Sequence, residues 1–147
     1  MEEGLRNRPF KCVGNELCKE LKRQYRLCRG LIVEDLARHV ENSDTIIVIE
    51  EFYNNVIGYQ NCYVYDVNTR NVRSYNFAWK KGTPFLSSKI LEDTPLQVSN
   101  IIASLADGTL VKCLENISKE RYTPAITYVI TIYFKVNDRY KVEYYET

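Results

Sequence analysis

The amino-acid sequence predicts an α+β domain in which helices pack on one face of a mainly antiparallel sheet of about five strands. Three observations lead to this prediction. Residues 95–120 repeat apolar side chains at helical spacing, residues 126–136 alternate them with a period of two, and three shorter strand-like segments precede both. The expected order is α-β-β-β-α-β-β, and the 147 residues fit one domain over residues 1–147.

Composition and charge narrow the class of protein. Hydrophobic residues make up 45% and charged residues 27%, which is typical of a folded globular domain. No apolar run is long enough to cross a bilayer, and the polar start MEEGLRNRPF does not fit a signal peptide, so we expect a cytoplasmic protein.

The cysteines and the single histidine predict neither disulfides nor a metal site. The five cysteines form no CxxC pair: Cys12, Cys18, Cys28, Cys62 and Cys113. In the cytoplasm these thiols are expected to stay reduced, and their spacings match no common zinc motif. We therefore expect no metal and no cofactor.

The amino-terminal part predicts a lead-in followed by helix. Residues 1–14 are polar and are expected to be loosely ordered. A helix is expected from Asn15, a suitable N-cap, because apolar side chains recur every three or four positions. They are Leu17, Leu21, Tyr25 and Cys28. Gly30 is expected to end or bend this helix, and a second short helical piece closes near Asn42. His39 falls late in that piece, as an ordinary surface residue.

The opposite face of the predicted first helix is basic. It carries Lys19, Lys22, Arg23, Arg26 and Arg29. These side chains are the best candidates in the chain for contacts with phosphate groups, although a solvated helix face is the more common outcome for such a run. A formal net charge of +1 excludes the broad positive field of many nucleic-acid-binding proteins, so only a local basic stripe remains.

Three strands are expected before residue 80. Residues 44–53 are rich in β-branched side chains and stop before an Asn-Asn pair. Residues 61–67 and 72–79 alternate in character and are separated by a polar turn, which predicts a hairpin. Both faces of this hairpin carry apolar residues, so neither face is expected to be wholly solvated.

A long helix is expected over residues 95–120. Its apolar side chains step by three or four residues: Val98, Ile102, Ala106, Leu110, Cys113 and Ile117. Because this pattern crosses Gly108 without interruption, one helix that tolerates or bends at the glycine is preferred over two helices separated by a loop.

The carboxy-terminal strands leave two registers to compare. Residues 126–136 alternate so that the even-numbered side chains face the core against the long helix. A two-residue turn sets Phe134 opposite Lys141 in the last strand, whereas a three-residue loop over residues 137–139 sets Phe134 opposite Val142. Apolar matching favours the longer loop.

No enzyme motif is recognisable in the sequence. There is no glycine-rich phosphate loop, no GxSxG elbow and no HExxH pair. Glu50 and Glu51 are adjacent carboxylates, but neighbours on a strand point to opposite faces and cannot share one substrate. We therefore expect a protein that acts by binding and not by catalysis.

Two segments carry a family resemblance. ITYVITIYFKVNDRYKVEYYE, residues 126–146, resembles the ending of the YezG-like immunity proteins, and NCYVYDVNTRNVRSYNF lies where that family has a tyrosine-rich hairpin. In those bacterial antitoxins a long helix leads into a strand, a short polar turn and a final strand of alternating aromatic and acidic residues. The order of elements is similar over residues 31–147.

The chain departs from that family in three ways. The family is typically acidic, whereas the formal charge here is +1; its turn usually supplies a glycine, whereas residues 137–139 read Asn-Asp-Arg; and the basic amino-terminal helix is additional. An acidic surface is expected of a nuclease inhibitor because it mimics phosphate, so neutrality leaves the activity of the toxin open.

The resemblance implies a cytoplasmic immunity protein that binds a cognate toxin domain and blocks its active site or an essential surface. Such proteins act in bacterial competition and contact-dependent growth inhibition. The residues themselves leave an alternative, a nucleic-acid-binding or regulatory module that uses the basic helix over residues 19–29. A domain that binds a small molecule is a third possibility.

The binding surface is expected on the sheet face that the helices leave open. That face is expected to present Tyr133, Lys135, Glu143 and Tyr145. Four further aromatic residues either extend this patch or belong to the core: Tyr63, Tyr65, Tyr75 and Trp79.

Overall fold

The computed structural model describes residues 16–39, 43–53, 61–119 and 126–146, without the side chains of residues 17, 18 and 53. The expected lead-in over residues 1–14 lies outside this part. The described elements are α2 (Glu16–His39), β1 (Thr45–Tyr53), β2 (Asn61–Asp66), β3 (Asn71–Lys80), β4 (Thr83–Ile90), α3 (Leu96–Asp107), α4 (Leu110–Lys119), β5 (Ile126–Val136) and β6 (Arg139–Glu146).

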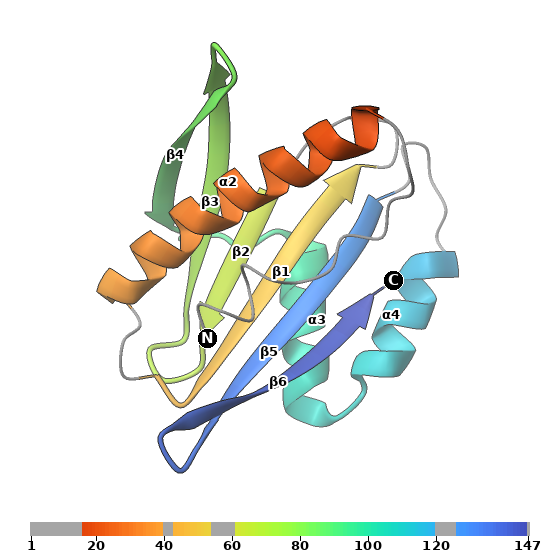
Figure 1. The fold of residues 1–147 in the computed structure, drawn as a ribbon. Coiled ribbons are helices and arrows are strands. Elements are labelled where there is room, and N and C mark those ends of the chain that lie inside the picture. The colour runs from red at the N-terminus through yellow and green to blue at the C-terminus, as the bar shows by residue number, and fades with distance from the viewer. Residues whose placement is uncertain (1–15, 40–42, 54–60, 120–125, 147) are drawn as a thin grey trace.

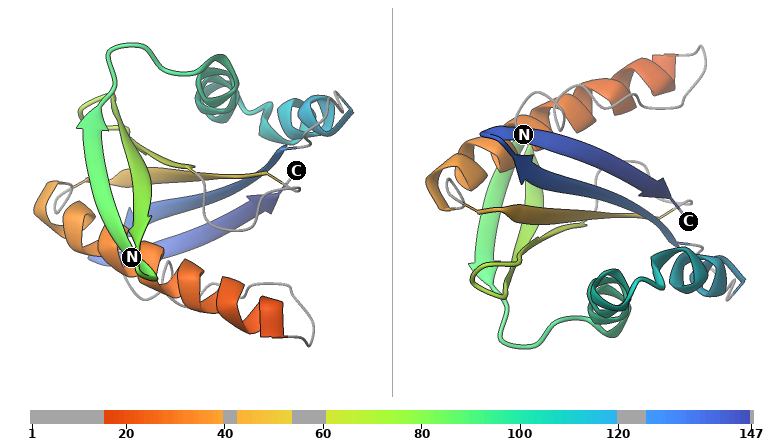
Figure 2. Two further views of the ribbon diagram at one scale, coloured as in Figure 1. Left: turned by 90° about the horizontal axis from the view of Figure 1, so that it is seen from above. Right: turned by 90° about the horizontal axis from the view of Figure 1, so that it is seen from below.

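The strands form one antiparallel sheet with helices on both faces. Its order is β4-β3-β2-β1-β5-β6. Helix α2 crosses one face, and α3 and α4 cover the other (Figures 1 and 2). The predicted α+β class is confirmed, with six described strands where about five were expected. The prediction that helices pack on one face only is wrong.

The central strand β1 explains why both faces need cover. Residues 46–49 are four consecutive apolar side chains, and all four are buried. Because successive side chains of a strand point to opposite faces, Ile46 and Val48 lie under α2 while Ile47 and Ile49 lie under α3 and α4. A strand that is apolar on both sides requires a helix layer on each side.

Helix α2 runs without interruption through Gly30, so of the two predicted effects of this glycine, an end or a bend of the helix, the end is wrong. The buried stripe continues across it, with Cys28 before and Ile32 and Leu36 after, all packed on the sheet. A glycine inside a helix costs about 1 kcal/mol, which this burial outweighs. His39 is the exposed last residue of the helix, as expected.

The predicted helix over residues 95–120 is two helices that meet at Gly108. That glycine has a φ of 78°, a left-handed conformation, and its N–H donates to the carbonyl of Ser104. The N–H of Thr109 also donates to Ser104, at 2.9 Å, and the chain enters α4 at Leu110. The apolar spacing crosses the break because both helices pack on the same core, so periodicity alone does not reveal it.

Strand β4 was not predicted. It pairs with β3 through a two-residue turn in which Lys81 and Gly82 have φ values of 51° and 74°. Its sequence, TPFLSSKI, does not alternate apolar and polar residues, and most of its side chains are exposed. Strand patterning detects half-buried strands, and this edge strand buries too little to be recognised.

The terminal hairpin has the two-residue turn and its register, so the prediction of a three-residue loop is wrong. Asn137 and Asp138 both have positive φ, 50° and 62°, and Phe134 pairs with Lys141. Asparagine and aspartate tolerate this conformation better than most residues. Apolar matching failed because Val142 and Tyr140 also reach a core, the one under α2.

The even-numbered face of β5 is core, as expected. Ile130 and Ile132 are buried against α3 and α4. Ile132→Ala should lower the free energy of unfolding by about 2 to 5 kcal/mol, because it removes buried methylenes and leaves a cavity. Ile90→Ala, at a half-exposed position, is the matched control and should cost less than about 1 kcal/mol in the same urea titration. Equal losses would contradict this assignment of the core.

Candidate functional site

The structure separates the residues that were expected to form one binding patch. Tyr133 and Tyr75 are each 0% exposed and lie in the core under α2. Tyr133 packs edge-to-face on Tyr140, and the hydroxyl of Tyr75 donates to Asp35 of α2 at 2.8 Å. Lys135, which shares this sheet face, is half-buried. The prediction that Tyr133 lies on an open face is wrong.

The remaining members lie elsewhere. Glu143, Tyr145, Tyr63 and Tyr65 are half-buried on the face that α3 and α4 cover. The Tyr145 hydroxyl donates to Glu143 at 3.1 Å, and this bond raises the pKa of Tyr145. The two-residue turn moves every side chain of β6 to the opposite face, and this shift divides the patch. Of the eight residues, Trp79 lies on the hairpin described below.

A buried ion pair holds α2 on the sheet. The guanidinium of Arg29 donates to both carboxylate oxygens of Glu50, at 3.1 and 3.4 Å, and both side chains are buried. The guanidinium also lies 5.3 Å from the ring centre of Tyr25. Arg29 therefore belongs to the core, and its inclusion in the exposed basic face was wrong.

Two more groups fix the same interface. Burial raises the pKa of Tyr75, and its hydrogen bond to Asp35 raises it further, so this hydroxyl keeps its proton and stays a donor. Burial also raises the pKa of Tyr25, against the opposing effect of Arg29. These contacts set the rotation of α2 about its axis and so decide which side chains point outward.

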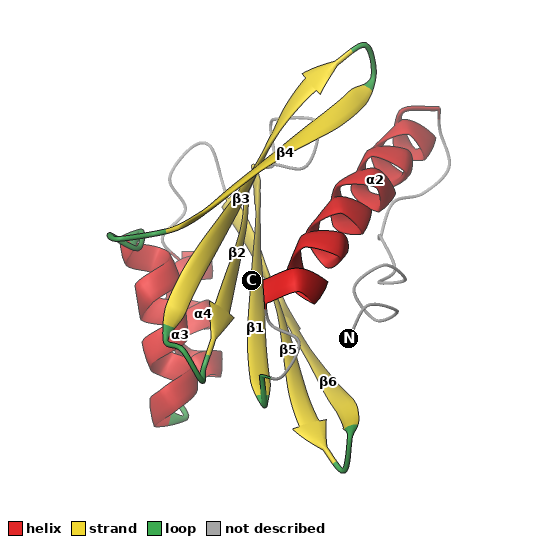
Figure 3. Cartoon of the chain, turned by 90° about the vertical axis from the view of Figure 1, so that its left-hand side faces the viewer, coloured by secondary structure: helices red, strands yellow, loops and turns green. Residues whose placement is uncertain are grey.

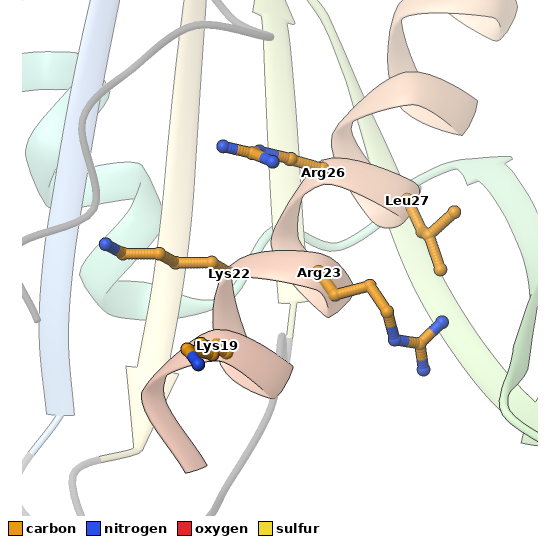
Figure 4. Close-up of a pocket in the computed structure, with 5 residues that line it drawn as sticks. All are labelled: Lys19, Lys22, Arg23, Arg26 and Leu27. Atoms are coloured by element: carbon orange, nitrogen blue, oxygen red, sulfur yellow. The ribbon is translucent and has the colours of Figure 1, made fainter. Parts of the chain in front are cut away.

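The outward side chains of the first half of α2 form a basic face. Lys19, Lys22, Arg23, Arg26 and Leu27 line a shallow pocket of about 390 Å³ (Figure 4). In that view Lys22 and Arg26 extend to one side of the helix, and Arg23 and Leu27 extend to the other. Leu27 is an exposed apolar residue among these charges.

Two of the four cations are already neutralised within the helix. Lys19 pairs with Glu16 at 3.0 Å, and Arg23 pairs with Glu20 at 2.7 Å. The bond from Arg23 is the main cause of a lowered pKa of Glu20. Within the described part of the chain, Lys22 and Arg26 form no ion pair.

Arg23 also joins this face to the β3–β4 hairpin. Its guanidinium donates to the carbonyl of Gly82 in the hairpin turn, at 3.4 and 3.5 Å. Residues 77–80 of β3 pair with β4 beyond the last described pairs of β3 with β2, so the hairpin tip projects from the sheet (Figures 1 and 3). Exposed apolar side chains lie along it: Trp79 (38%), Phe85 (54%) and Ile90 (50%).

Other features offer less chemistry. A polar groove of about 550 Å³ runs between α3 and α4, with Asn100, Lys112 and Asn116 among its lining. Among the described residues, no group of three or more His, Cys, Asp or Glu side chains could hold a metal ion. Cys28, Cys62 and Cys113 are free thiols, and the remaining two cysteines lie outside the described side chains.

Comparisons with protein-family models, with curated proteins and with solved structures find no match to this chain. None of the described helices is long and apolar enough to cross a membrane. The surfaces themselves must therefore indicate the function. Sequence reasoning found the basic helix but missed the hairpin, for which the one local signal was Lys81-Gly82 between two short segments.

The role of the buried ion pair can be tested by comparing a single with a double substitution. Glu50→Leu should lower the free energy of unfolding by about 3 to 5 kcal/mol, because it leaves the Arg29 charge buried without its carboxylate. Adding Arg29→Met should recover most of this lost stability, since two apolar side chains of similar volume leave no buried charge without a partner. Urea unfolding of both variants measures this. A double variant no more stable than Glu50→Leu would contradict a role based on charge compensation.

Thiol reactivity tests the burial of the core under α2. Burial raises the pKa of Cys28 to about 12, with Arg29 opposing the shift, so little thiolate exists near neutral pH. In the native protein Cys28 and Cys62 should react with iodoacetamide much more slowly than the half-buried Cys113, as followed by peptide mass spectrometry. After denaturation without reductant, all five cysteines should be modified. Fast native labelling of Cys28 would contradict the packing of α2.

Proposed function

We propose that this chain is a non-catalytic, cytoplasmic immunity protein that binds and neutralises a cognate toxin domain. The resemblance of residues 126–146 to YezG-like immunity proteins supports the class. Free thiols at Cys28, Cys62 and Cys113 support the compartment, because the cytoplasm keeps cysteines reduced. The partner in this proposal is a protein, and neither metal nor cofactor takes part.

The observation that carries the proposal is the projecting β3–β4 hairpin. Strand β4 is the last strand of the described sheet on its side, so its outer edge has no described partner strand. Exposed Phe85 and Ile90 lie on this strand, and Trp79 lies beside it on β3. An exposed edge with aromatic and aliphatic anchors suits the addition of a partner strand.

The ladder geometry supports this binding mode. The N–H of Leu91 donates to the carbonyl of Val72 at 2.8 Å, so odd-numbered residues of this segment direct their N–H groups toward β3. In an antiparallel ladder the alternate residues direct theirs away, so the even-numbered residues of β4 face outward. Pro84, which has no N–H, occupies one of these positions.

The alternative is a nucleic-acid-binding or regulatory module that uses the basic helix. The pocket lined by Lys22 and Arg26 favours it. Against it, Arg29 is buried with Glu50, and Lys19 and Arg23 are paired with Glu16 and Glu20. Few cations are left for the phosphate contacts that give nucleic-acid binding its affinity, so we rank this alternative second.

The experiment is co-expression with a candidate toxin domain, which is to be sought among the products of the neighbouring genes. The chain should protect growth and co-purify with that domain. Ser88→Pro should weaken the complex by about tenfold or more, because it removes an outward N–H from the β4 edge and spares the ladder to β3. Isothermal titration calorimetry measures the affinity.

Ser88→Ala is the matched control for the lost hydroxyl, which lies 3.5 Å from Asp35, and it should leave the affinity unchanged. Absence of both protection and co-purification would reject the immunity function. A complex that tolerates Ser88→Pro would instead reject strand addition at β4.

A further inference from the structure

Lys22 and Arg26 form an unneutralised cation pair at one flank of α2. They lie four residues apart, so their side chains are neighbours on the helix surface, and both extend to the same side (Figure 4). Within the described residues neither forms an ion pair, whereas Lys19 and Arg23 each have a glutamate. Lys22 is also half-buried, which weakens its hydration.

This arrangement has a cost that an anion would remove. Like charges at this helical spacing repel one another and destabilise the helix. No described carboxylate relieves the repulsion, although Glu16 and Glu20 lie within one or two turns on the same helix. An anion held between Lys22 and Arg26 would convert the repulsion into two attractive contacts.

We propose that this cation pair binds an acidic segment of a partner protein, and that the segment crosses the helix to reach Leu27 on its other side. A partner carboxylate lies between Lys22 and Arg26, and an apolar side chain of the same segment contacts Leu27, which is 39% exposed. This inference rests on the proposed function, because it names the chemistry of the surface that the toxin presents.

Charge complementarity favours a protein segment over nucleic acid. Lys19, Lys22, Arg23 and Arg26 are opposed on the same helix by Glu16 and Glu20, so only two cations are left for new ion pairs. A polynucleotide gains affinity by releasing counterions from many phosphates and gains nothing from an aliphatic side chain such as Leu27. An acidic protein segment with an apolar residue matches both features.

The consequence concerns the type of toxin. A nuclease carries a basic cleft for phosphates, and its inhibitor is expected to be acidic. A basic contact face on the inhibitor instead fits a toxin whose blocked surface is acidic. Arg23, which contacts the hairpin turn, extends from the other side of α2, so a partner that covers both the cation pair and the hairpin must cross the helix.

The test uses fluorescence anisotropy with labelled probes of defined charge. They are a peptide of four Glu-Glu-Leu repeats, the same peptide with glutamine in place of glutamate, and a single-stranded oligonucleotide of similar length. The acidic peptide should bind, more weakly as salt increases, and the glutamine peptide should not. The double substitution Lys22→Glu with Arg26→Glu should lower the affinity for the acidic peptide by about tenfold or more without lowering the melting temperature of the protein.

Lys112→Glu with Lys119→Glu, two exposed lysines of α4 on the other side of the sheet, is the matched control and should leave peptide binding unchanged. The proposal is overturned if the acidic peptide does not bind or if the control variant lowers its affinity by the same factor. It is also overturned if the oligonucleotide binds more tightly than the acidic peptide. Its failure differs from failure of the proposed function: a complex with the toxin domain that ignores the Lys22 and Arg26 changes would overturn this inference alone.

Discussion

The ion pair between Arg29 and Glu50 lies at the centre of the interface on which the rest of the molecule depends. A buried charge is tolerated only when it is paired and hydrogen-bonded, and here the guanidinium reaches both carboxylate oxygens while it also faces the Tyr25 ring. Glu50 lies on β1, between Cys62 of β2 and Val129 of β5. Because the two hydrogen bonds fix the orientation of the Arg29 side chain as well as its position, the pair determines where α2 lies on the sheet and how it is rotated about its axis.

The rotation of α2 in turn defines its outer surface. With Tyr25, Cys28 and Ile32 directed into the core, the basic side chains of the first turns must point to solvent or to the hairpin. Arg23 reaches the carbonyl of Gly82, which connects the helix to the β3–β4 hairpin. Arg23 therefore connects the two regions, although it lies 59 residues from Gly82 in the sequence.

The packing of helices on both faces of the sheet also decides which side chains remain exposed for binding. The central strands are apolar on both faces, and among the described residues α2 packs on one face while α3 and α4 pack on the other. The accessible surfaces of the described residues include the outer edge of β4, the hairpin tip and the outer face of α2. Tyrosines that look like interface residues in the sequence instead fill the core, as Tyr75 and Tyr133 do.

The sequence by itself determined the class of fold, the position of most strands and the basic character of α2, because these follow from local periodicity and composition. Tertiary structure decided the rest. The face on which Glu143 lies depends on a turn shorter by one residue than expected, because a shift of one residue in a strand reverses every side chain. Tyr133 is buried because α2 covers the sheet face on which it lies. The pairing of Arg29 with Glu50 joins residues that are distant in sequence, so no local pattern reveals it. Strand β4 buries few side chains, so it leaves no periodic pattern of apolar residues.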